Sequence, residues 1–179
     1  FPTRRSSDLA SPKGSYRMEA DSVSGEALAD CLVLAVPHRP STDTELLALG
    51  AWLLARFMGR VWVAVELHRR LDDESWLERL QALAEATAIP LVAAGDVHMH
   101  RRSRKPLQDT LTAIRLGKPM ADCGHDLQPS AERHLRSRLR LALTYPPELL
   151  AETLRVAARC QFSLDELRYR YPKEVVPNG

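Results

Sequence analysis

An acid and two histidines follow directly after an apolar run in the segment LVAAGDVHMHRRSRK, residues 91–105. In an extended chain, residues two apart point to the same side, so Asp96 and His98 are expected to share a face. A carboxylate and a neutral imidazole are ligands of zinc, manganese or iron. The spacing predicts part of a divalent-metal site. The alternative is an ordinary strand-to-loop junction in which Asp96 caps a turn and His98 is solvated.

The preceding apolar run, VWVAVEL, ends in the same way, with Glu66 and His68 two residues apart. If the two runs are neighbouring parallel strands, two carboxylates and two imidazoles converge at one edge of the sheet. His68 is therefore a third candidate metal ligand. The alternative is that Glu66 is a structural acid paired with an arginine and that His68 lies on the surface.

Short apolar runs rich in β-branched residues predict strands buried on both faces over residues 31–36, 61–67 and 90–96. Apolar residues at helical spacing predict helices between them, over 42–57 and 72–87. Crossovers of this length join parallel strands, as in a β/α barrel or a doubly wound sheet. The sequence therefore predicts an α/β fold.

Polar residues at the starts of these two helices are typical of N-terminal caps. Thr42 is followed three residues later by Glu45, the spacing of a capping box. Asp72 or Asp73 is expected to cap the second helix.

The pattern after residue 104 is helical, with helices expected over 106–116, 130–143 and 147–160. Within the second of these, Arg133, Arg136 and Arg140 are spaced to lie on one stripe. A stripe of guanidinium groups suits contacts with DNA phosphates, and the alternative is a solvated face. The segment lacks the interleaved aromatic side chains that stack on single-stranded bases.

The composition is that of a globular protein, with 45% hydrophobic and 27% charged residues and a net charge of +2 over 179 residues. No apolar run approaches the ~20 residues that cross a bilayer, so no membrane association is expected. The three cysteines are far apart and show no CxxC spacing, which favours reduced, buried thiols in a cytoplasmic protein. No motif for nucleophilic catalysis is present.

The motifs VELHR, AAGDVHMH, QDTLTAIR, ERHLR, YPPELLAET and FSLDELRY follow one another in this order. From about Gly14 onward, this order resembles the bacterial error-prone DNA polymerases, which are C-family paralogues of the replicative DNA polymerase III alpha subunit. The first nine residues, FPTRRSSDL, instead resemble a translated sequencing adapter and are treated as non-native.

The resemblance implies that residues 10–104 are the later part of a PHP (polymerase and histidinol phosphatase) domain, a distorted β/α barrel, and that residues 105–179 are a helical segment leading to the polymerase palm. The family's closing D-x-H metal motif maps onto Asp96 and His98, which implies a zinc or manganese ion. The histidine that often follows the ELxxH-type strand end in this family falls near Arg70 in this chain, and His68 is the candidate substitute for it. The upstream H-x-H motif is absent.

The resemblance also implies what the complete protein does. Its activity would be template-directed, low-fidelity DNA synthesis from deoxynucleoside triphosphates during translesion repair in the cytoplasm, together with accessory mutagenesis proteins and the sliding clamp. The magnesium-binding palm aspartates would lie beyond Gly179, so this chain alone is expected to be catalytically inert. The alternatives are a freestanding PHP-type metal-dependent phosphoesterase and a non-catalytic module that binds DNA or protein.

Overall fold

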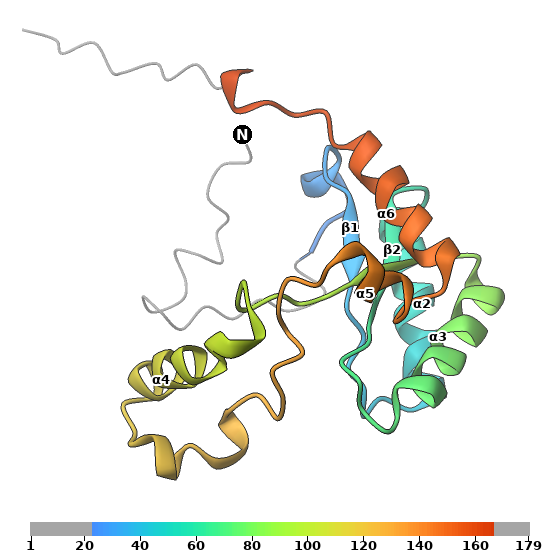
Figure 1. Ribbon diagram of the computed structural model, residues 1–179. Helices are drawn as coiled ribbons and strands as arrows, with labels where there is room; N and C mark the ends of the chain where they lie inside the picture. The colour runs from blue at the N-terminus through green and yellow to red at the C-terminus, as the bar shows by residue number, and fades with distance from the viewer. Residues whose placement is uncertain (1–22, 167–179) are drawn as a thin grey trace, which may run out of the picture.

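The computed structural model describes residues 23–166 of the chain. The adapter-like residues 1–9 and the proline-rich end of the predicted helical segment, from residue 167, lie outside the described residues. The boundary expected between residues 104 and 105 lies inside them and stays a prediction; a sheet with its helices precedes this point and a mainly helical segment follows it (Figure 1).

A parallel sheet of three strands forms the centre of the fold, in the order β1 (Val33–Ala35), β2 (Val61–Glu66) and β3 (Leu91–Ala94). Helix α2 (Asp43–Phe57) connects the first two strands and α3 (Asp73–Thr87) connects the second two. The predicted alternation of strands and helices is confirmed, although each strand is shorter than its apolar run. The fold is mixed α/β with crossover helices, consistent with part of a PHP-type barrel.

Strand β2 is buried on both faces because helices cover the sheet on each side. Its odd-numbered valines, with Val63 and Val65 fully buried, pack in one core cluster with Leu46 of α2 and Leu80 of α3. Burial of such side chains contributes ~1.5–3 kcal/mol each. The prediction that this continuous apolar run forms a strand buried on both faces is therefore confirmed.

Helix α6 (Pro147–Arg159) contributes to the second face of the sheet. Trp62 and Val92 form a cluster there against which Val156 packs. The indole N–H of Trp62 donates to Glu152 Oε1 at 2.8 Å, and the Arg159 guanidinium lies 5.0 Å from the Trp62 ring. The expected helix over 147–160 is thus confirmed, and it packs against the sheet (Figure 1).

The two crossover helices begin differently. Thr42 caps α2 in a capping box, in which its side chain accepts from the Glu45 amide and Glu45 accepts from the Thr42 amide. The prediction for the second helix is confirmed for the position of the cap but not for its hydrogen bond. Asp72 is at the N-cap position of α3 but makes no side-chain cap hydrogen bond, because its carboxylate pairs with Arg39 and Arg70.

Helix α4 (Lys105–Leu116) stands away from the sheet (Figure 1). The 3-10 turn η3 (Arg102–Arg104) precedes it, and η4 (Met120–Asp122) and η5 (Gly124–Asp126) follow. The expected helix over 106–116 is confirmed. Ala113 is its one buried residue, whereas three of its large apolar side chains remain at least half exposed: Leu107, Leu111 and Ile114.

The helix expected over residues 130–143 was wrong for most of its length. Only α5 (Arg138–Ala142) is an α-helix, with Ser137 accepting a capping hydrogen bond from the Arg140 amide. Residue 134 instead forms a parallel β-bridge with Met99. Because the backbone before Ser137 pairs with a distant segment, helical spacing there does not produce a helix.

Two 3-10 turns complete the described chain, η2 (Glu26–Leu28) and η6 (Leu164–Glu166). All three cysteines are free, as predicted, but only Cys123 is buried, whereas Cys31 and Cys160 are exposed. Between residues 23 and 166, no helix has both the length and the apolar character needed to span a membrane.

Candidate functional site at the strand ends

The carboxyl ends of β2 and β3 lie side by side because Glu66 is in register with Ala94. The backbone leaves the extended conformation just after β3, at Asp96, whose φ is 39°. Aspartate is among the few residues that tolerate this left-handed region. Asp96 and His98 therefore approach each other through this left-handed residue, and not through the two-residue pleat of a strand.

Both oxygens of the Asp96 carboxylate have partners. His98 Nε2 lies 3.0 Å from Asp96 Oδ1, and the Gln108 amide nitrogen lies 3.5 Å from His98 Nδ1. Because an ionised carboxylate only accepts, His98 Nε2 carries the proton of its hydrogen bond to Asp96. Asp96 Oδ2 forms an ion pair with Arg133.

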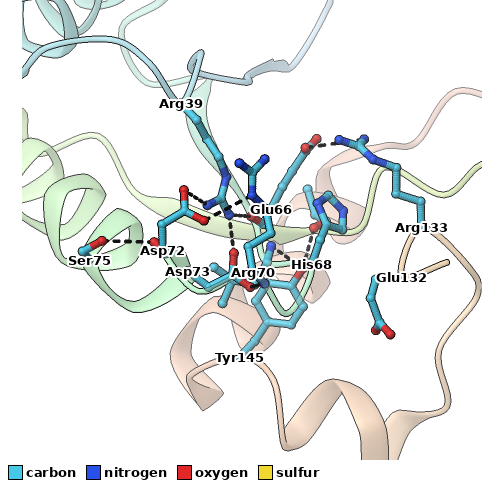
Figure 2. A network of polar contacts seen from close by, with 12 residues as sticks. Arg39, Glu66, His68, Arg70, Asp72, Asp73, Ser75, Glu132, Arg133 and Tyr145 are labelled. Carbon is cyan, nitrogen blue, oxygen red and sulfur yellow. Dashed lines mark hydrogen bonds and ion pairs between the residues drawn. The ribbon is translucent and has the colours of Figure 1, made fainter. Parts of the chain in front are cut away.

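Arg133 brings a positive charge between the two strand ends. Its Nη1 contacts Asp96 and lies 3.9 Å from Glu66 Oε2, and Figure 2 shows the Glu66 and Arg133 side chains directed toward each other. Burial lowers the pKa of Arg133, whereas the Glu66 charge raises it. Since a guanidinium stays protonated in proteins, Arg133 neutralises part of the negative charge here.

His68 is buried, with 6% of its surface exposed, and therefore is not the surface residue of the alternative interpretation. Its Nε2 lies 3.1 Å from the Gly95 carbonyl oxygen, which can only accept, so Nε2 carries a proton. Burial lowers the pKa of His68, and the charges of Arg133 and Arg136 lower it further, although the Gly95 hydrogen bond opposes them. His68 is thus a neutral side chain that ties the two strand ends together.

Tyr145 makes a second connection between the strand ends (Figure 2). Its hydroxyl donates to the Ala94 carbonyl oxygen at 2.6 Å and accepts from the Leu67 amide at 3.2 Å. Burial raises the pKa of Tyr145, so the hydroxyl stays protonated. Nothing in the sequence pattern distinguished this tyrosine.

Arg39, from the loop after β1, completes the network (Figure 2). Its Nη2 donates to the Glu66 carbonyl oxygen at 2.9 Å and pairs with Asp73, while its Nη1 lies 3.0 Å from Asp72. The sequence prediction missed Arg39, although the motif PHRP directly follows the first apolar run. The rule applied to Asp96, that polar residues after a strand gather at one edge, would have found it.

A cavity of about 570 Å³ opens at this edge of the sheet. Basic and acidic side chains both line it, and most of the charged groups already have partners of opposite sign. Its charged and imidazole-bearing lining residues are His38, Arg39, Glu66, His68, Arg70, Asp72 and Arg133.

The donors at this edge do not fit a divalent metal ion. Arg133 already pairs with Asp96 and lies 3.9 Å from Glu66, so a metal ion would have to compete with a guanidinium for these carboxylates. His68 donates from Nε2 to Gly95, which leaves only its Nδ1 lone pair for a metal ion. Within residues 23–166, no group of three or more histidine, cysteine, aspartate or glutamate side chains is placed to hold a metal. The zinc or manganese ion expected at Asp96, His98 and His68 stays a prediction that this arrangement does not favour.

The three arginines expected on one DNA-binding stripe have different positions. Arg133 lies at the strand ends, and Arg136 is buried, donating to the Leu67 carbonyl oxygen at 2.8 Å. Arg140 lines a separate cavity with Leu143. The stripe was wrong because its helix does not form, and DNA binding by these residues stays a prediction.

Comparison with known proteins identifies relatives along nearly the whole chain. It is 55% identical over 171 residues to an error-prone DNA polymerase of Dechloromonas aromatica, a match that covers 93% of this chain. It is 50% identical to the error-prone DNA polymerases of Azoarcus sp. over 173 residues and of Methylococcus capsulatus over 170 residues. No protein-family model matches the chain.

The chain spans 16% of the length of each of these three relatives. Identity of this degree along 93–95% of the chain reflects common ancestry and confirms the resemblance given by the motif order. The chain therefore belongs to the error-prone DNA polymerase family and corresponds to one segment of those proteins.

Proposed function

We propose that this chain is the scaffold segment of an error-prone DNA polymerase and forms the later part of a PHP-type domain. The observation that carries the proposal is the 55% identity to a protein named error-prone DNA polymerase over 93% of the chain. The parallel sheet, with its polar side chains gathered at the carboxyl ends of the strands, supports a PHP-type fold.

The strand-end network supports a structural role for this segment. Several charged or polar groups that a hydrolase would direct at a substrate are used internally: Arg39 on Asp73, Arg133 on Asp96, and His68 on Gly95. A catalytic group must instead be within hydrogen-bond reach of a substrate. The network therefore holds strand ends and loops together.

The complete polymerase would then perform template-directed DNA synthesis with low fidelity past damaged bases. Its substrates would be primed DNA and deoxynucleoside triphosphates, and magnesium ions bound outside this segment would stabilise the charge that develops during nucleotidyl transfer. We place this activity in the cytoplasm, together with accessory mutagenesis proteins and the sliding clamp.

Primer extension by the full-length protein tests this proposal. We expect a polymerase that contains this segment to extend a primer across a lesion when magnesium and nucleotides are present, and the 179-residue chain alone to extend none. Full-length protein without extension on damaged or undamaged templates would contradict the proposal. Zinc- or manganese-dependent hydrolysis of a phosphate ester by the chain alone would favour the phosphoesterase alternative.

A further inference from the structure

The motif ERHLR, residues 132–136, does not form the phosphate-binding stripe that its spacing predicted. The proposed function gives it no other role. We call these residues the latch segment. Its backbone pairs with the chain that follows Asp96: the amides of His98 and Met99 donate to the Arg133 carbonyl oxygen at 2.9 and 3.2 Å, and the Leu135 amide donates to Met99 at 3.1 Å. The backbone of Arg133 is therefore fixed beside the strand ends.

Side chains on both sides of Arg133 hold the latch segment in place. Glu132 pairs with Arg102 at 3.0 Å, and Arg136 donates to the Leu67 carbonyl oxygen at 2.8 Å. The side chains of Glu132 and Arg136 are only 4% and 3% exposed. Because buried charged groups are costly without partners, these contacts strongly restrict where the segment can lie.

The fixed backbone places the Arg133 guanidinium between two carboxylates. Its Nη1 contacts Asp96 Oδ2 and lies 3.9 Å from Glu66 Oε2, and its side chain is 22% exposed. These are the oxygens that a metal ion at this edge would need. A second cation beside the guanidinium would be repelled in this partly buried setting.

We propose that Arg133 supplies the positive charge that a metal ion would otherwise supply to the cluster formed by Asp96 and Glu66 at the ends of β2 and β3. Its guanidinium neutralises Asp96 and Glu66, closes this edge of the sheet to divalent metal ions, and attaches the latch segment to the ends of β2 and β3. A guanidinium needs no coordination shell of about four ligands, unlike zinc. A site with too few metal ligands can therefore still be neutralised by one arginine.

Metal titration of the 179-residue chain is the first test. Thermal unfolding is measured in the presence of zinc or manganese chloride and in chelator, for the wild type and for Asp96→Asn. We expect the same Tm with and without metal, because Arg133 occupies the carboxylates. A metal-dependent rise in Tm that is lost in Asp96→Asn would overturn the proposal.

A double-mutant cycle is the second test. Arg133→Gln is expected to lower Tm by about 4–8 °C because it leaves two carboxylates without their cation. The matched control Arg140→Gln, which removes an arginine outside the cluster, is expected to lower Tm by less than about 2 °C. In an Asp96→Asn background, Arg133→Gln should lower Tm by clearly less, since the residue that pairs with Arg133 is already neutral.

Equal falls for Arg133→Gln and Arg140→Gln, or a fall for Arg133→Gln that does not depend on Asp96, would overturn the proposal. If Arg133→Gln does not fold, Arg133→Lys replaces it in the cycle. Lysine keeps the charge but lacks the planar guanidinium and its spread of donors, so an intermediate fall in Tm that depends on Asp96 is expected. None of these measurements depends on polymerase activity, so their outcome is separate from that of the proposed function.

Discussion

The sheet with its two crossover helices and the helical segment after residue 104 differ in how they use apolar side chains. In the first region, β2 and the inner faces of α2 and α3 are buried together. In the second, Tyr145 and Leu149 join the same cluster, but α4 leaves Leu107, Leu111 and Ile114 at least half exposed. Helical spacing therefore indicates where an apolar face forms, whereas the burial of that face depends on a partner elsewhere in the polypeptide.

The largest expected difference between the two regions is in the cost of shortening a leucine. Leu80→Ala removes a side chain with no exposed surface and is expected to destabilise the chain by ~2–5 kcal/mol. Leu111→Ala in α4 is expected to change stability by less than ~0.5 kcal/mol. Urea unfolding measures both. Equal losses would mean that the apolar face of α4 is covered in solution, which would contradict the difference in burial between the two regions.

A hydroxyl that joins the two regions gives the next largest effect. Tyr145→Phe removes the donor to Ala94 and the acceptor for Leu67 without changing the ring. We expect a loss of ~1–3 kcal/mol in the free energy of unfolding, because two buried backbone groups lose a partner.

Thr110→Val is the matched control for Tyr145→Phe, since its exposed hydroxyl bonds only to Pro106 within α4. Its substitution should cost less than ~0.5 kcal/mol. A loss for Tyr145→Phe no greater than that of Thr110→Val would show that the strand ends do not depend on the tyrosine hydroxyl.

The starts of α2 and α3 give a smaller difference, within the first region. Thr42→Ala removes a capping box and should cost ~1 kcal/mol, measured by urea unfolding. Asp72→Ala removes no cap, the Asp72 carboxylate is half exposed, and Arg39 keeps Asp73 as a partner, so its cost should stay below that of Thr42→Ala. The reverse order would mean that Asp72 caps α3 in solution.

The smallest expected effect is a pH dependence from His68. Its pKa is lower in the folded chain than the ordinary value of about 6.5. Below that pH the unfolded chain binds more protons than the folded chain, so the stability that His68 provides is present above about pH 6.5 and declines as the pH falls toward the folded-state pKa.

The measurement is the urea midpoint of wild type and His68→Gln at about pH 7.5 and about pH 5.5, on either side of the ordinary histidine pKa. The wild type should lose more stability on acidification than the variant. The effect is small because the Gly95 hydrogen bond partly offsets the lowering of the pKa. Identical pH dependence in both proteins would show that His68 does not titrate differently on folding.

The sequence was sufficient to predict those elements that are determined by the pattern of their own residues. The continuous apolar run of β2 and the capping box at Thr42 are local signals, and both are confirmed. The meeting of Asp96 and His98 was also predicted, although a left-handed backbone conformation at Asp96 produces it and not an extended strand. Local chemistry selected the right residues even where it gave the wrong backbone.

The features that the sequence did not predict depend on contacts between distant residues. The latch segment has helical spacing but pairs with Met99, and Arg133 reaches carboxylates from two strands. Tyr145 connects backbone groups that lie 51 and 78 residues away. Tertiary pairing overrides a weak local preference for helix, and a single sequence contains no record of which distant partner is available.

The contact between α6 and Trp62 determines how this protein can be shortened. The acceptor of the indole N–H, Glu152, is contributed by a helix that begins more than 80 residues after Trp62. A polypeptide ending at residue 104 would retain all three strands but would expose one face of the sheet to solvent and leave the tryptophan N–H without its acceptor. Such a truncation is expected to self-associate, so the smallest soluble unit extends at least to Arg159.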